Sequence, residues 1–74
     1  MNQYLIVFQP YGKNEFYYSV MDWKTIEELL RKNEKAHGRF RIWLLEADNN
    51  PKNIHIVHSG NTYWLEDMYG NITD

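Results

Sequence analysis

The chain has 74 residues, a formal net charge of −2 and no cysteine. A chain of this length has room for one hydrophobic core, and the lack of cysteine excludes disulfide bonds and cysteine-ligated zinc as stabilising devices. Twelve aromatic residues therefore have to contribute much of the stability, through packing, through self-association or through both.

The first twenty residues predict a β-hairpin. Residues 4–9 form a continuous apolar run that ends at Pro10, which is typical of a buried strand. A turn follows, and residues 15–20 then alternate as a second strand does. The two faces of this strand carry Phe16, Tyr18 and Val20 on one side and Glu15, Tyr17 and Ser19 on the other.

A helix is predicted over about residues 23–37. Asp22 is a natural N-cap, and apolar side chains share one arc of the helical wheel. Gly38 stands where a left-handed C-cap belongs. Basic residues in the last turn favour this end through the helix dipole.

Strand character returns after the helix. Further strands are predicted at residues 40–47, 54–58 and 62–66. Gly60 and Asn61 separate the last two as a tight hairpin turn does, and residues 67–74 form either a short last strand or a frayed tail. The sequence thus predicts a single α+β domain over residues 1–74, ordered ββαβββ, with a twisted antiparallel sheet and one helix packed on one face.

Catalytic and cofactor motifs are weak in this sequence. His55 and His58 project to opposite faces of a strand and cannot both ligate one ion. The two serines lack a nucleophile motif, and the four isolated glycines make no phosphate loop. We therefore expect no enzyme activity, no metal and no cofactor. An enzyme would instead need His55 or His58 within hydrogen-bond reach of a carboxylate in a pocket.

Basic residues concentrate in one segment. Residues 31–41 carry five of them against a single acidic residue, namely Arg31, Lys32, Lys35, Arg39 and Arg41 against Glu34. Such a cluster is a candidate nucleic-acid contact, whereas its simpler interpretation is stabilisation of the helix end. The acidic isoelectric point of about 5.8 weighs against a stand-alone nucleic-acid binder.

The predicted sheet has more apolar surface than one helix covers. Five strands span roughly 24 Å, whereas a helix is about 10 Å across. The strands at residues 4–9 and 40–47 are apolar on both faces. Either the sheet curls around its own aromatics, or the open face docks a second copy, another protein or stacked bases. The hot-spot residue types predict a partner-binding group of Tyr17, Arg41, Trp43 and Trp64.

These features favour a non-enzymatic protein-binding module that acts by occupying the surface of a partner protein. The size and acidity are typical of small accessory or inhibitor proteins of phages and mobile elements. A homodimer would also meet the stability need of so short a chain. The alternative is a nucleic-acid-binding regulator that uses the basic helix end. No apolar run is long enough to cross a bilayer and no signal peptide is visible, so we expect a cytoplasmic protein without membrane contact.

Overall fold

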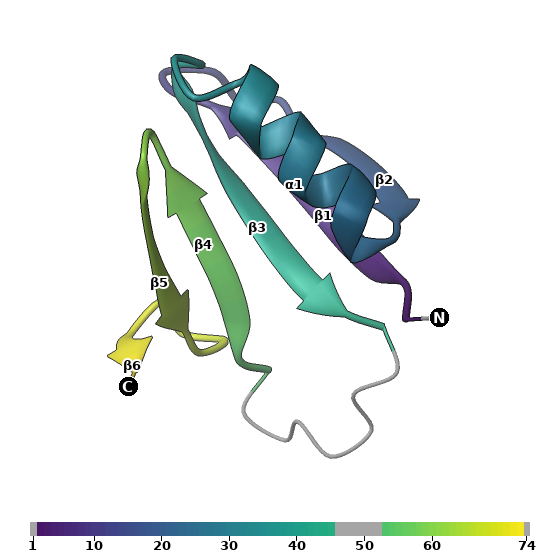
Figure 1. Ribbon diagram of the computed structural model, residues 1–74. Coiled ribbons are helices and arrows are strands. Elements are labelled where there is room, and N and C mark those ends of the chain that lie inside the picture. The colour runs from purple at the N-terminus through teal and green to yellow at the C-terminus, as the bar shows by residue number, and fades with distance from the viewer. Residues whose placement is uncertain (1, 46–52, 74) are drawn as a thin grey trace.

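The computed structural model describes residues 2–45 and 53–73, and within them six strands and one helix follow one another along the chain (Figure 1). The elements are β1 (Tyr4–Pro10), β2 (Tyr17–Met21), α1 (Trp23–Lys32), β3 (Gly38–Leu44), β4 (His55–Ser59), β5 (Thr62–Glu66) and β6 (Ile72–Thr73). The predicted α+β class with an antiparallel sheet and one helix is confirmed. A short β6 follows the predicted ββαβββ order.

The strands form one sheet in the order β2-β1-β3-β4-β5-β6, and every neighbouring pair is antiparallel. The apolar β1 and β3 lie next to each other inside the sheet, which explains why both are apolar on two faces. Gly60 joins β4 to β5 with a positive φ of 63°. Glycine adopts this angle without the steric cost that a side chain would add, so the tight turn fixes the β4–β5 register.

β5 has the predicted bounds of residues 62–66 and β1 begins at the predicted residue 4, whereas the other described strand ends differ from the sequence-based bounds by one to three residues. β2 runs over 17–21 rather than 15–20, β3 over 38–44 rather than 40–47, and β4 over 55–59 rather than 54–58. The last two residues of the strand predicted at 40–47 lie outside the described residues.

The helix is shorter than its periodicity predicts. Asp22 caps its start by accepting a hydrogen bond from the Thr25 backbone N–H at 2.9 Å. The end predicted near residue 37 is corrected to Lys32, because Asn33 closes the helix. Its side-chain Nδ2 donates to the Leu29 carbonyl at 2.8 Å, and its backbone N–H donates to the Leu30 carbonyl.

Gly38 is therefore not the left-handed helix C-cap that the sequence predicts. It begins β3, where its backbone lies directly against the ring of Phe8. A Cβ at this position would collide with that ring and lie 2.8 Å from the Gln9 carbonyl oxygen. Close approach of β1 to β3, rather than a left-handed φ, accounts for the glycine.

The core lies between α1 and the sheet. Ile26 of α1 is fully buried against Ile6, Phe40 and Ile42. Aromatic rings extend this layer, since Tyr4 packs on Trp23 and Phe8 packs on Phe40 with ring centroids 5.4 and 4.6 Å apart. α1 lies over the β1 side of the sheet and leaves β4, β5 and β6 beyond its edge (Figure 1). Within the described residues, no helix has the length and apolar character that crossing a membrane requires.

The packing of α1 divides the sheet into two faces, which we call the helix side and the helix-free face. Because side chains alternate along a strand, Ile6 and Ile42 point to the helix side, while Leu5, Val7 and Trp43 point to the helix-free face. The β1–β2 register pairs Ile6 with Ser19 and Val7 with Tyr18. Tyr18 and Val20, the more apolar row of β2, therefore lie on the helix-free face.

Candidate partner-binding surface

The strand registers line up side chains of the helix-free face in rows across the sheet. One row runs from Tyr18 through Val7, Arg41 and Val57 to Trp64. The next row begins with Val20, Leu5 and Trp43 on β2, β1 and β3. Side chains paired in this way are direct neighbours, so the face is one continuous surface.

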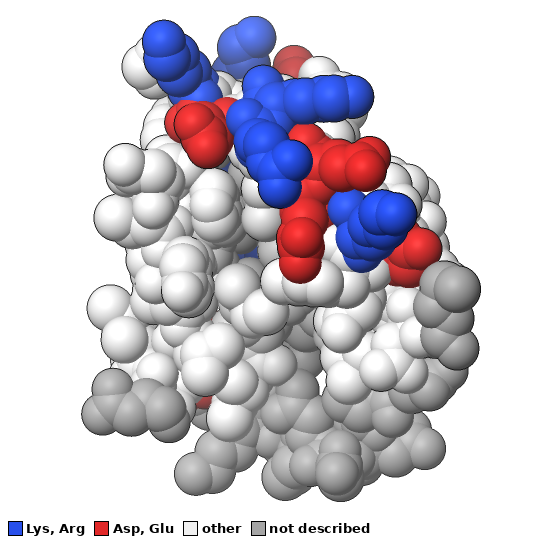
Figure 2. Space-filling view, in the orientation of Figure 1, with Lys and Arg blue, Asp and Glu red and all other residues white. Residues whose placement is uncertain are grey.

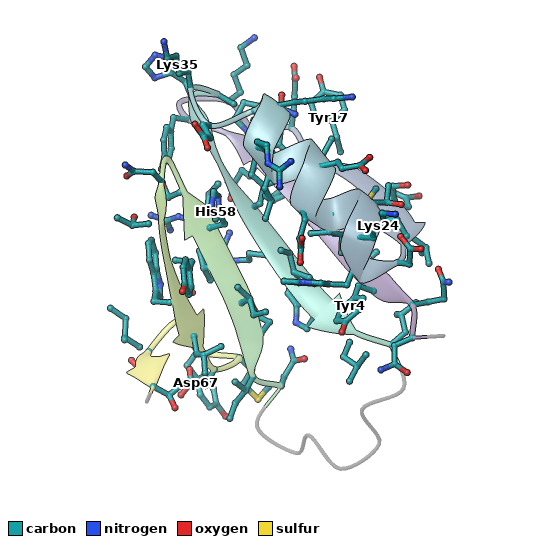
Figure 3. All side chains as sticks on the ribbon, in the orientation of Figure 1. Tyr4, Tyr17, Lys24, Lys35, His58 and Asp67 are labelled. Carbon is teal, nitrogen blue, oxygen red and sulfur yellow. The ribbon has the colours of Figure 1, made fainter. Side chains whose placement is uncertain are left out.

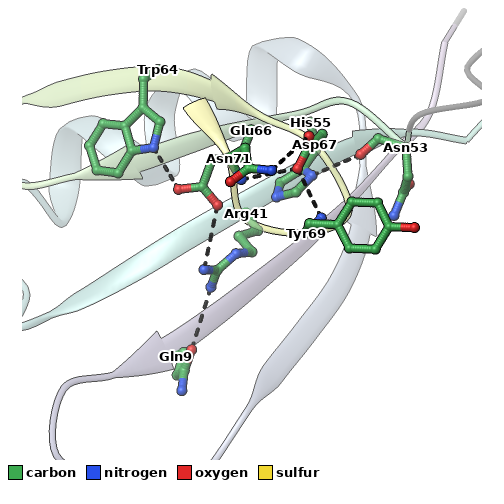
Figure 4. Close-up of polar contacts among 9 residues, drawn as sticks. All are labelled: Gln9, Arg41, Asn53, His55, Trp64, Glu66, Asp67, Tyr69 and Asn71. Carbon is green, nitrogen blue, oxygen red and sulfur yellow. Dashed lines mark hydrogen bonds and ion pairs between the residues drawn. The ribbon is translucent and has the colours of Figure 1, made fainter. Parts of the chain in front are cut away.

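An ion pair and an indole hydrogen bond close the part of this face over β3, β4 and β5 (Figure 4). Glu66 accepts a hydrogen bond from Trp64 Nε1 at 2.6 Å, and its other carboxylate oxygen lies 3.8 Å from Nη2 of Arg41. Gln9 Oε1 accepts from Nη1 of Arg41 at 3.4 Å. The Glu66 side chain is only 7% exposed, so these contacts compensate a carboxylate that is largely removed from water.

Ring packing completes the same region. Trp43 stacks on His55 with ring centroids 4.5 Å apart, and the guanidinium of Arg39 lies 5.7 Å from the centre of the Trp64 ring. Val57 is fully buried although it points away from the helix. We call the part of the helix-free face over β3, β4 and β5 the closed half.

The part over β1 and β2 is open. Tyr18 is 78% exposed and Val20 is 53% exposed, and both sit on the outermost strand. Their β1 neighbours Val7 and Leu5 are half-buried. We call this part of the helix-free face the open half.

The structure brings three of the four predicted partner-binding residues together. Arg41, Trp43 and Trp64 share the closed half, and all three are half-buried by their own contacts. Tyr17 lies on the helix side instead, where its hydroxyl donates to Glu15 at 2.7 Å (Figure 3). This hydrogen bond and the negative charge of Glu15 raise the pKa of Tyr17 above its ordinary value.

Tyr18 and Val20 were not among the predicted site residues, yet they are the exposed apolar side chains of the open half. Alternation places them on one strand face. Which face receives the helix is decided by the packing of α1 on Ile6 and Phe40, far along the chain.

The five predicted basic residues fall into two groups on opposite sides of the sheet. Arg31 and Lys32 end α1, and Lys35 follows at the tip of the molecule (Figure 3). Arg39 and Arg41 lie on the helix-free face. On the helix side, Figure 2 shows the Lys and Arg side chains interspersed with Asp and Glu rather than in an unbroken basic area.

The helix side has a groove of its own beside α1. Its volume is about 720 Å³, and Trp23, Leu30 and Arg31 of the helix face Ile56, His58 and Tyr63 of the sheet across it. The surface over β4 and β5 in this view carries little charge (Figure 2). Glu27 and Glu34 join Arg31 along the groove, so both signs of charge border it.

The two β4 histidines lie on opposite faces of the sheet, as strand alternation predicts. His55 donates from Nδ1 to the Asn53 carbonyl at 3.1 Å, and His58 packs edge-on against Phe40. Across the described ranges, no hydrogen bond joins either histidine to a carboxylate, and no three His, Cys, Asp or Glu side chains gather as metal ligands would.

No family model matches the chain, and neither a curated protein nor a solved structure shows significant similarity to it.

Proposed function

We propose that this chain is a non-enzymatic protein-binding module that docks a partner protein through the open half of the helix-free face. The supporting observation is the orientation of β2. Its more apolar row points away from the helix, and Tyr18 and Val20 are more than half exposed there. Exposed apolar groups that adjoin the half-buried Leu5 and Val7 form the kind of contiguous patch that binds proteins.

The chemistry beside the patch indicates the kind of partner. Arg39 and Arg41 lie on the same face, and Glu66 is the carboxylate that pairs with Arg41. Within residues 2–45 and 53–73, no carboxylate forms an ion pair with Arg39. A partner surface with apolar side chains and an acidic residue at its rim would complement this arrangement.

The same geometry favours protein over nucleic acid as the partner. A nucleic-acid contact through Arg31, Lys32 and Lys35 would leave Arg39 and Arg41 on the other side of the sheet. Acidic side chains also separate the basic ones over α1 (Figure 2). Both features weaken the continuous positive potential on which nucleic-acid affinity depends.

The test is affinity capture from the native host with a matched pair of variants. The double variant Tyr18→Ser, Val20→Thr removes the apolar patch and keeps a β-branched residue in β2. The control Tyr63→Ser removes an equally exposed tyrosine on the helix side, since Tyr63 is 76% exposed.

We expect one captured protein to be retained by the wild type and the control and lost by the double variant. Binding of the two purified proteins, measured by calorimetry, should then weaken at least ~10-fold in the double variant. Equal capture by all three chains, or loss only in the control, would contradict the proposal.

A further inference from the structure

The two edges of the sheet differ in length and chemistry. β6 closes one edge with only two residues, Ile72 and Thr73. β2 forms the other edge with five residues, and within the described residues no strand pairs with its outer side (Figure 1). Short edge strands resist pairing with other chains, whereas long ones present a row of free backbone N–H and C=O groups.

β2 also lacks the features that usually protect an edge. The segment 16–21, Phe-Tyr-Tyr-Ser-Val-Met, has no charged residue, no proline and no glycine. Phe16 and Tyr17 are 57% and 58% exposed, in addition to Tyr18 and Val20. A charge-free aromatic strand of this kind has high β-propensity and favours the addition of another strand.

We propose that a second copy of this chain pairs with β2 in antiparallel fashion about a two-fold axis at Ser19. In this register Ser19 faces its own symmetry mate, Tyr18 faces Val20 of the second copy, and Tyr17 faces Met21 of the second copy. Each pair joins two even-numbered or two odd-numbered residues, whose side chains lie on the same face of the sheet. Both helices therefore lie on the same side of one continuous sheet.

Self-complementarity of the β2 sequence is the argument for a second copy as the occupant. Each tyrosine of the strand meets an aliphatic side chain, and pairs of aromatic and β-branched residues stabilise antiparallel strands. The row Leu5–Val20 of one copy continues into Tyr18–Val7 of the other, through the observed β1–β2 register. A two-fold contact needs such a strand because each side must accept its own sequence.

This inference goes beyond the proposed docking face and does not depend on it. Ser19 is exposed and lies on the helix side, paired with Ile6 across β1. Its substitution changes the edge and leaves Tyr18 and Val20 in place. A Ser19 variant that no longer dimerises but still binds the partner protein therefore distinguishes the two contacts, which both use Tyr18 and Val20.

Sedimentation velocity over a range of protein concentrations tests the dimer. The variants Ser19→Lys and Ser19→Glu each place like charges opposite each other on the axis, which destabilises the pairing. We expect a concentration-dependent dimer for the wild type and loss of that dimer in each variant. An equimolar mixture of the two variants should restore it as a heterodimer, which also shows that both variants fold. The control Tyr63→Lys, on β5, should dimerise as the wild type does.

A cysteine cross-link fixes the register. The chain has no cysteine, so Ser19→Cys gives a single thiol that can form only an intermolecular disulfide. Directly opposed residues of antiparallel strands have Cα atoms roughly 4.5–5.5 Å apart, within the range that a disulfide spans. Ser19→Cys should oxidise rapidly to a covalent dimer, whereas Tyr63→Cys should not. A wild type that stays monomeric up to millimolar concentration, or a dimer unaffected by both charged variants, would overturn the proposal.

Discussion

The closed and open halves of the helix-free face both carry aromatic and aliphatic side chains. Those of the closed half pack against each other, whereas those of the open half are exposed to water. In the closed half, Trp64 donates to Glu66, Trp43 stacks on His55, and Val57 is fully buried. In the open half, Tyr18 and Val20 stand on the outermost strand with more than half of their surface in water. The difference lies in position in the sheet, because interior strands supply neighbours on both sides and an edge strand supplies them on one.

The aromatic residues of the chain have different roles in the two halves. The tryptophans are the residue type most often associated with binding hot spots. Here Trp43 and Trp64 are half-buried and engaged with side chains of their own sheet. The docking surface that we propose is instead on β2, and it is selected by exposure and strand position rather than by residue type.

The largest expected difference between the halves comes from two identical substitutions. Val57→Ala removes two methyl groups from a fully buried site and should lower the free energy of unfolding by ~2 kcal/mol. Val20→Ala, at a site 53% exposed, should lower it by ~0.5 kcal/mol or less. Urea unfolding of both variants measures the difference. Equal losses would show that the two halves are not distinct.

The polar network of the closed half should contribute nearly as much to the free energy of unfolding as the Val57 side chain does. Glu66→Ala leaves the Trp64 indole N–H and the partly buried Arg41 without their shared acceptor and should destabilise the fold by ~1.5 kcal/mol. Glu66→Gln keeps an oxygen that accepts from Trp64 and should lose about half as much. The comparison uses the same urea experiment. A Glu66→Ala variant as stable as the wild type would mean that the closed half is held by its rings alone.

A smaller effect is expected at Asp22, which belongs to neither half. Hydrogen bonds from Thr25, from its side chain first and its backbone N–H second, lower the pKa of Asp22 below its ordinary value of 3.8. The folded state therefore favours the charged form. The resulting stability is present above about pH 3.8 and is lost as the pH falls through the lower pKa of the folded state.

Asp22→Asn tests this assignment because asparagine also caps helices but does not titrate. Thermal unfolding should show a decrease in the melting temperature of the wild type in this acidic range that exceeds the decrease of the variant by a few degrees. At neutral pH the two proteins should melt close together. An identical acid dependence of the two proteins would exclude Asp22 as its source and would leave the contrast between the two halves unaffected.

Local signals in the sequence were sufficient for much of the fold. The hairpin around Gly60 follows from a turn whose geometry depends on two residues, and Asp22 caps α1 as its residue type predicts. The helix end could not be read from periodicity, because the side chain of Asn33 closes the helix while the apolar pattern continues to Ala36. Cap geometry of this kind competes with the hydrophobic pattern and leaves little trace in it.

The candidate site could be predicted only in part. Alternation alone places Arg41 and Trp43 on one face of β3. The position of Trp64 on the same face as Arg41 and Trp43 depends on the β4–β5 register. The exposure of Tyr18 depends on which side of the sheet packs against α1. Both are contacts between distant parts of the chain. Sequence periodicity gives the two faces of a strand but not the neighbour that each face meets.

The most direct measurement of the central claim is site-specific photo-crosslinking in the native host. A photoreactive phenylalanine analogue replaces Tyr18 in one variant and Tyr63 in the other, two tyrosines that are 78% and 76% exposed on opposite faces of the sheet. We predict a crosslink from position 18 to a partner protein other than a second copy of this chain, and no such crosslink from position 63. Crosslinks to a partner from position 63 alone would contradict the account.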